Sequence, residues 1–159
     1  MKFLKKNLKW AFLGLMLVFA GLQFVQPAHT NPPVKTDFVA TLNPPAKIAD
    51  MFHAACYDCH SNQTRWPWYS HVAPMSWQIL QDVNDGRDAL NLSEWPADNP
   101  KSEWKRMEDM SELVGDSEMP IKKYTLIHAD ARLTADQRKE LTDWLDAQVD
   151  DLKSRAGAN

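Results

Sequence analysis

Apolar positions along the chain predict a series of amphipathic helices behind an apolar N-terminal run. From residue 45 onward, apolar residues recur at three- and four-residue spacing, which places them on one face of a helix. Four helices follow from this spacing: about Pro45 to Ala55, Pro74 to Leu90, Pro100 to Gly115, and Thr134 to Leu152. No segment shows the strict alternation that is typical of a half-buried strand, so the sequence predicts an all-α fold.

Each predicted helix carries one apolar stripe that supplies candidate core residues. The stripes are Ile48, Met51, Phe52 and Ala55; Trp77, Leu80, Val83 and Leu90; Trp104, Met107 and Val114; and Leu141, Trp144, Leu145, Val149 and Leu152. Asn99 is a candidate N-cap of the third helix, and Gly115 is a natural stop for it. Thr134 and Gln137 form the pattern of a capping box at the start of the last helix.

The first 25 residues have the pattern of an export signal or membrane anchor. Four lysines, Lys2, Lys5, Lys6 and Lys9, stand at the start of the chain, and all of them precede the first acidic residue, Asp37. The apolar run over residues 10–25 has 16 residues, about 24 Å as a helix, slightly less than the roughly 30 Å core of a bilayer. Because no clean cleavage site follows, we expect an uncleaved anchor in preference to a cleaved signal. A buried N-terminal helix of the domain is the third interpretation.

The rest of the chain divides into a linker, one domain and a tail. Residues 26–44 are rich in proline, which fixes φ and removes a backbone donor, so an extended linker is expected there. The folded domain is expected over residues 45–152 and a disordered tail over residues 153–159. Since lysines collect on the cytoplasmic side of membranes, everything after residue 25 is expected in the periplasm.

Composition and charge exclude several classes of protein. The chain has 159 residues, of which 44% are hydrophobic and 25% charged, which suits one globular domain with an appendage. The net charge is −3, and −7 beyond Lys9, so a nucleic-acid partner is not expected. Two cysteines can form at most one disulfide, so the protein is not a disulfide scaffold.

Both cysteines belong to the sequence Cys56-Tyr57-Asp58-Cys59-His60, which directly follows the first predicted helix. The spacing C-x-x-C-H is the attachment signature of c-type haem. Two thiols three residues apart can reach the two vinyl groups of one porphyrin, and the adjacent histidine can present its imidazole to the iron. The sequence therefore predicts one covalently attached haem c, bound through Cys56 and Cys59 with His60 as an iron ligand.

Two other interpretations of this motif stay open from the sequence. A thioredoxin-like redox pair, or a disulfide, would be expected in a βαβ context, which this sequence lacks. A zinc site could combine the motif with His53 or His71, although structural zinc sites usually show a second pair of ligands.

A low-spin haem iron needs a sixth ligand, and Met119 is the best candidate. It follows His60 by 59 residues, precedes Pro120, and lies in a stretch without helical periodicity. Thioether ligation raises the reduction potential relative to a second histidine. Met119 could instead fill the core. The sixth ligand would then be Met75 or His71, or the sixth position would be open.

A cluster of aromatic residues follows the motif and is a candidate for further haem contacts. Trp66, Trp68 and Tyr69 are flat side chains with donor groups, suited to the edge of a porphyrin and its propionates. Arg65 could pair with a propionate. The same aromatic residues could also belong to the domain core.

These motifs together resemble the bacterial haem-binding domain family related to cytochromes c. The resemblance begins with residues 56–69, CYDCHSNQTRWPWY, and continues through residues 91–95, 115–120 and 128–144. It implies that Cys56 and Cys59 hold the haem, that His60 is the proximal ligand and that Met119 is the distal one.

The function expected from these features is electron transfer by a His/Met monohaem cytochrome at the outer face of the cytoplasmic membrane, with a redox partner that the sequence does not identify. Two alternatives remain. A haem-based sensor or gas-binding module would have a displaceable sixth ligand. A haem peroxidase would need an open iron site, and the two-haem enzymes of that kind would show a second C-x-x-C-H. No enzymatic activity is expected.

Overall fold

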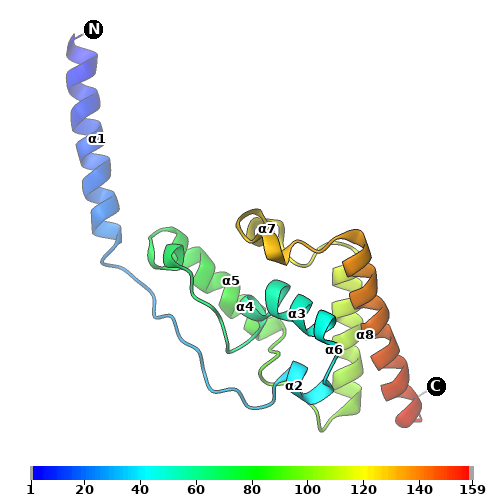
Figure 1. Ribbon diagram of the computed structural model, residues 1–159. Coiled ribbons are helices and arrows are strands. Elements are labelled where there is room, and N and C mark those ends of the chain that lie inside the picture. Colours follow the sequence, from blue (N-terminus) through cyan, green and yellow to red (C-terminus); the bar gives the residue numbers. More distant parts are fainter. Residues whose placement is uncertain (1, 158–159) are drawn as a thin grey trace.

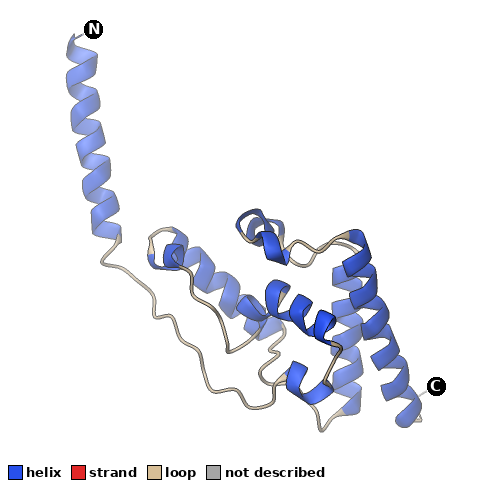
Figure 2. Cartoon of the chain, in the orientation of Figure 1, coloured by secondary structure: helices blue, strands red, loops and turns tan. Residues whose placement is uncertain are grey.

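The computed structural model describes the backbone of residues 2–157 and the side chains of residues 7–157. Within this range the fold is all-helical and contains no strand, as predicted (Figures 1 and 2). The α-helices are α1 (Lys2–Leu22), α2 (Phe38–Leu42), α3 (Ala46–Ala55), α4 (Tyr57–His60), α5 (Met75–Ala89), α6 (Pro100–Gly115), α7 (Lys122–Ile127) and α8 (Ala135–Arg155). Two 3-10 turns, η1 (Trp68–His71) and η2 (Ala129–Ala131), complete the elements.

The predicted helix ends are largely confirmed by hydrogen bonds. The Asn99 side chain accepts from the Ser102 amide at 3.1 Å and caps α6. The capping box at the start of α8 is present, with Thr134 and Gln137 bonded to each other in both directions. Helix α8 runs three residues beyond the predicted end at Leu152, so the expected tail is helical as far as Arg155. Residues 158 and 159 of that tail lie outside the described residues.

The core lies where α3 and the paired helices α6 and α8 meet (Figure 1). The predicted stripe of α3 is buried in full, and those of α6 and α8 are buried except for their partly exposed tryptophans. The stripe of α5 is less well predicted, because Val83 is buried whereas Trp77 is exposed. Outside the core, the side chains of Lys153 and Glu108 form an ion pair between α8 and α6.

The segment expected as a free linker is bonded along the surface of the domain. Its backbone carbonyls accept from side chains of the domain: Arg87 donates to Thr30 at 3.0 Å, and Asn62 donates to Pro33 at 3.0 Å. Further along, the Lys35 amide donates to the Ser93 carbonyl at 2.9 Å. The prolines remove backbone donors from this segment, but the backbone carbonyls of the segment can still accept hydrogen bonds. These bonds fix the segment on the domain surface, so it is not a free spacer.

The domain also begins earlier than the predicted boundary near Pro44. Helix α2 lies inside the expected linker, and its first residue, Phe38, is fully buried. The Phe38 ring packs edge-to-face on Phe52 at 4.7 Å and on Trp95 at 4.6 Å between centroids. The Asp37 carboxylate caps α2 by accepting from the Ala40 amide. The sequence reading missed α2 because five residues are too few to show a helical period.

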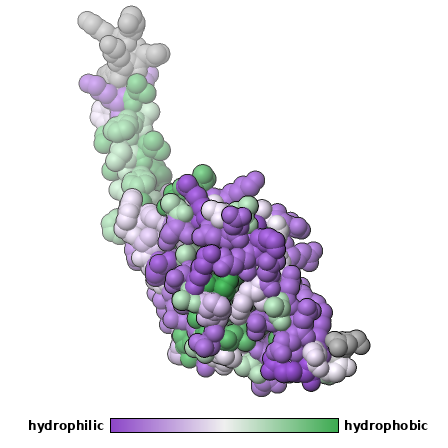
Figure 3. Space-filling view, turned by 45° about the vertical axis from the view of Figure 1, so that its right-hand side comes forward, coloured by the Kyte–Doolittle hydropathy of each residue, from purple (hydrophilic) through white to green (hydrophobic). Residues whose placement is uncertain are grey.

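Helix α1 extends away from the domain (Figure 1), and Figure 3 shows its apolar side chains apart from a mostly hydrophilic domain surface. Its large apolar residues are exposed, for example Leu15 and Leu17. The interpretation of this segment as a buried helix of the domain is therefore wrong. Within residues 2–157, no helix combines the length and apolar character needed to cross a bilayer.

Replacing Phe38 by Ala should lower the free energy of unfolding by about 3–5 kcal/mol, because a buried ring is removed from the core. The matched control is Phe24→Ala, since Phe24 is 90% exposed; that change should stay within about 0.5 kcal/mol. Urea denaturation followed by circular dichroism measures both. Equal and small effects would show that the domain begins at Pro44 after all.

Candidate functional site

The C-x-x-C-H motif consists of Cys56, which separates α3 from α4, and of the single helical turn α4 itself. The Cys56 amide donates to the Phe52 carbonyl at 2.9 Å and so ends α3, while the Cys56 carbonyl accepts from the His60 amide at 2.9 Å and starts α4. Cys56 and Cys59 are three residues apart on this turn, so their side chains share one side of the chain. Both cysteines are free thiols.

Two adjoining cavities lie against the motif. One has a volume of about 430 Å³ and is bordered by Cys56, and the other has a volume of about 280 Å³ and is bordered by Cys59. His60 and Met119 line both cavities. Each volume is near the lower end of the range for small-molecule and cofactor sites. The two cysteines therefore border neighbouring cavities that have His60 and Met119 in common.

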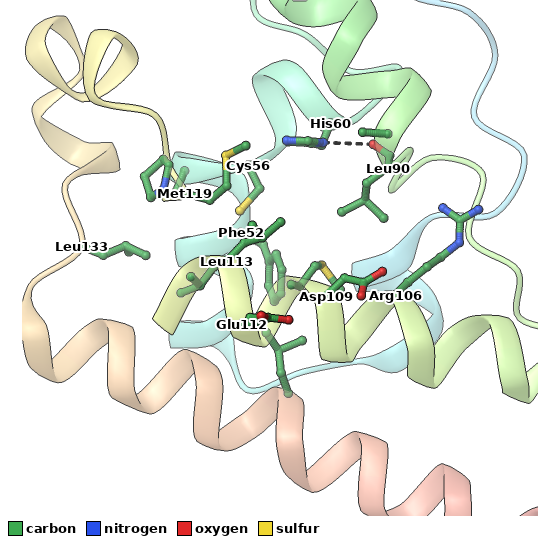
Figure 4. A pocket seen from close by; sticks show the side chains of 16 residues that line it. Phe52, Cys56, His60, Leu90, Arg106, Asp109, Glu112, Leu113, Met119 and Leu133 are labelled. Atoms are coloured by element: carbon green, nitrogen blue, oxygen red, sulfur yellow. Dashed lines mark hydrogen bonds between the residues drawn. The ribbon is translucent and has the colours of Figure 1, made fainter. Parts of the chain in front are cut away.

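The larger cavity is walled mainly by apolar side chains from α3, α6 and α8 (Figure 4). Its apolar lining includes Phe52, Leu90, Met110, Leu113, Leu133 and Leu145. Charged residues of α6, namely Arg106, Asp109 and Glu112, also border it (Figure 4). Such a cavity suits a large, flat, mostly apolar group that carries a few polar substituents.

Two backbone carbonyls fix the orientation and the tautomer of His60. The ring atom Nδ1 lies 2.9 Å from the Gly86 carbonyl oxygen and 3.1 Å from that of Leu90. Because a carbonyl can only accept, Nδ1 must carry the proton, and Nε2 keeps its lone pair for a metal. Burial lowers the pKa of His60, and these two hydrogen bonds oppose that shift only in part. The imidazole is therefore held neutral, as a metal ligand must be.

Gly86 allows α5 to approach the motif closely enough to make these bonds. A Cβ at this position would lie 2.7 Å from the Cys59 carbonyl oxygen, which is closer than real Cβ contacts allow. Any other residue would push α5 away from α4 and stretch the bond from His60 to the Gly86 carbonyl. The glycine at position 86 thus lets the carbonyls of Gly86 and Leu90 come within hydrogen-bond distance of His60.

Burial raises the pKa of the Cys56 thiol to about 12, and the neighbouring Cys59 adds to this shift. Burial likewise raises the pKa of the Cys59 thiol to about 11, with smaller contributions from Asp82 and Asp58. Catalytic and redox-active cysteines need a lowered pKa, because the thiolate is the reactive form. The redox-pair interpretation of the motif therefore has no electrostatic support.

The zinc interpretation fails on geometry. Among residues 2–157, no group of three or more His, Cys, Asp or Glu side chains is arranged to hold a metal ion. His53 packs its ring against Tyr57 at 4.3 Å, and His71 packs against His29 at 4.3 Å between centroids. Neither histidine borders the cavities beside Cys56 and Cys59.

The structure brings Met119 to the same cavities as His60 and leaves the alternative sixth ligands elsewhere. The Met119 amide donates to the Leu113 carbonyl at 3.0 Å, so the chain turns back over the end of α6. Met75 borders a different cavity, which His60 does not line, and its side chain is exposed. His71 borders neither of the two cavities beside the motif.

The four residues expected to contact the porphyrin edge have other surroundings. Arg65 forms a two-point pair with Asp58, at 3.1 Å from Nε to Oδ1 and 3.0 Å from Nη2 to Oδ2. Trp66 packs on the ring of His29, and Trp68 is 78% exposed. The Tyr69 hydroxyl is hydrogen bonded to His128. None of the four lines the cavities beside His60, because the chain after Ser61 turns away toward residues 29–31.

Sequence reasoning missed three residues that shape the site. Gly86 sits inside the predicted second helix, where an isolated glycine is a signal of close packing. Leu90 was expected only in an apolar stripe, and its backbone carbonyl is the part that contacts His60. Arg138 of α8 donates to the Met119 carbonyl at 2.7 Å, a contact between distant segments that leaves no trace in local sequence.

An all-helical fold with two thiols, one neutral imidazole and one thioether around an apolar cavity is the arrangement of a haem-binding domain. The family model described as "Haem-binding domain" matches residues 17–147, so the chain belongs to the haem-binding domain family. No curated protein and no solved structure matched the chain in the corresponding searches.

Gly86→Ala should lower the free energy of unfolding by about 1–3 kcal/mol, because the added methyl group overpacks the contact between α5 and α4. Gly115→Ala is the matched control, since a Cβ there meets nothing nearer than the Thr142 Cγ2 at 4.0 Å. That control should be neutral or stabilising by up to about 1 kcal/mol. Thermal unfolding measures both, and equal effects would mean that the approach of α5 is not tight.

Proposed function

We propose that this protein is an electron-transfer protein with one covalently attached haem c. The observation that carries the proposal is the pair of adjoining cavities, each bordered by one cysteine of the motif, that share His60 and Met119. The thiols of Cys56 and Cys59 would each form one thioether by adding across a haem vinyl group, with the thiol hydrogen passing to the second vinyl carbon.

The residues present fit this cofactor. The imidazole Nε2 of His60 has a free lone pair because Nδ1 is held by Gly86 and Leu90. Met119 offers a soft thioether, which favours the ferrous state and raises the reduction potential. Apolar side chains, among them Phe52 and Leu145, form most of the lining of the larger cavity and suit the faces of a porphyrin. Haem, when bound, supplies reversible one-electron chemistry.

Two protein ligands to one iron suit electron transfer better than catalysis or gas binding, because neither axial position is left open. His60 and Met119 both border the same space, so the iron would have no vacant position for a small molecule. The chain beyond Lys9 carries a net charge of −7, which would steer a basic redox partner toward it. The partner is therefore proposed to be a protein with a basic docking face.

We further propose that residues 1–25 direct export, so that the domain works in the periplasm. The support is the sequence pattern of four lysines before an apolar run, and the separation of α1 from the domain core.

N-terminal sequencing of haem-loaded protein from each cell fraction tests whether residues 1–25 direct export. A new terminus between Gly21 and Val34 would mark a cleaved signal, and an intact start in the membrane fraction a retained one. Haem-loaded protein found only in the cytoplasm would refute export.

Haem attachment should require both Cys56 and Cys59. After coexpression with a haem-ligation system, peroxidase-activity staining of a denaturing gel should detect the wild-type chain and lose its signal in the double variant Cys56→Ala, Cys59→Ala. Each single variant should keep one thioether and stain more weakly. Full staining of the double variant would end the proposal of covalent attachment.

If Met119 binds the iron, the ferric protein should show the weak far-red absorption of an iron–thioether bond. Met119→Ala should remove this band, lower the reduction potential and open the iron to carbon monoxide or cyanide. Met75→Leu is the control, because an apolar swap of similar volume typically costs less than about 1.5 kcal/mol and Met75 lies outside both cavities. Rapid and complete carbon monoxide binding by the wild-type ferrous protein would instead favour a gas-binding module.

A further inference from the structure

The segment that carries Met119 is held at two points. Arg138 and Asp58 border neither of the cavities beside His60, whereas Tyr124, which is bonded to Asp58, lines the smaller one. We infer that Arg138 and the Asp58–Tyr124 pair are positioning residues that hold Met119 in place to bind the iron. This inference rests on the proposed role of Met119 as a ligand and adds how the protein fixes that ligand.

Arg138 holds the backbone of Met119 directly. From the first turns of α8, its Nη1 donates to the Met119 carbonyl at 2.7 Å and also to the carbonyl of Val114. Val114 lies at the end of α6, where helix carbonyls lack partners within the helix. One guanidinium therefore joins the end of α6 to Met119, which lines the same cavities as His60. Its positive charge also suits the negative end of a helix.

Asp58 holds the other end of the same segment. The Tyr124 hydroxyl donates to Asp58 Oδ2 at 2.8 Å, and the Asp58 carboxylate is itself fixed by the backbone amide and the guanidinium of Arg65. Asp58 is only 7% exposed. Because Asp58 stands between Cys56 and Cys59, this bond ties the segment with Met119 to the haem-attachment turn itself.

These two bonds matter because the Met119 side chain cannot hold itself in place. A thioether is a weak hydrogen-bond acceptor with flexible torsions, so its position is set by the backbone that carries it. The backbone between α6 and α7 is an irregular turn, in which Ser117 has a positive φ of 63°. The Arg138 bond fixes this turn at Met119, and the Tyr124 bond fixes α7, which follows the turn. Both bonds lower the conformational entropy that is lost when the thioether binds a metal.

The test uses the haem-loaded, full-length protein and imidazole as a competing ligand for the ferric iron. Arg138→Gln and Tyr124→Phe should each weaken the far-red iron–thioether band and tighten imidazole binding about 10-fold, because a charged or buried hydrogen bond is lost. Arg138→Lys should recover part of the effect, since an ammonium can still donate to a carbonyl. Thermal unfolding of each variant, recorded in parallel, separates loss of the fold from loss of the ligand.

The matched control is Arg132→Gln. Arg132 also donates to two backbone carbonyls, those of Thr125 at 2.6 Å and Leu126 at 3.0 Å, but neither bond reaches Met119. This variant should leave the far-red band and imidazole affinity unchanged. The inference is overturned if Arg138→Gln and Tyr124→Phe lower the unfolding temperature but keep wild-type imidazole affinity, or if Arg132→Gln changes that affinity equally. A wild-type protein without the far-red band would instead refute Met119 as the ligand.

Discussion

The contact between α5 and α4, the helix that contains Cys59 and His60, is the constraint on which the rest of the site depends. Backbone carbonyls of a helix can accept from an imidazole only near the end of the helix or where the imidazole comes very close. Both conditions are met here. Gly86 has no Cβ to block the approach, and Leu90 follows the last residue of α5. The two carbonyls decide which nitrogen of His60 is free. Without them the ring could rotate, and either nitrogen could carry the proton.

Much of this protein could be predicted from its sequence, because the informative signals are local. The period of apolar residues gave the core face of α3, and Asn99 and Thr134 marked where two helices begin. The residues of the C-x-x-C-H motif are contiguous in the chain, so their proximity could be predicted without the tertiary structure. Met119 could be proposed from its place in an irregular stretch, and the structure does bring it to His60.

The errors arose where side chains met partners distant in sequence. Arg65 looked available for a propionate, but Asp58, inside the motif, takes its guanidinium. Prolines around residues 27–45 suggested a spacer, yet Phe38 is drawn into the core by the rings of Phe52 and Trp95, and its burial outweighs the weak local preference. Tertiary packing of this kind has no signature within a window of ten residues.

The site lies between two parts of the chain, and each part is stabilised mainly by contacts among its own helices. The half with His60 consists of α3, α4 and α5, whose contacts are close in sequence, whereas the half with Met119 depends on α6 pairing with α8. Residues of both halves line the cavities, among them His60 from the first and Met119 from the second. A ligand that binds only the folded state stabilises it by mass action. If haem is attached to the first half and bound by the second, as proposed, it would couple the stability of the two halves.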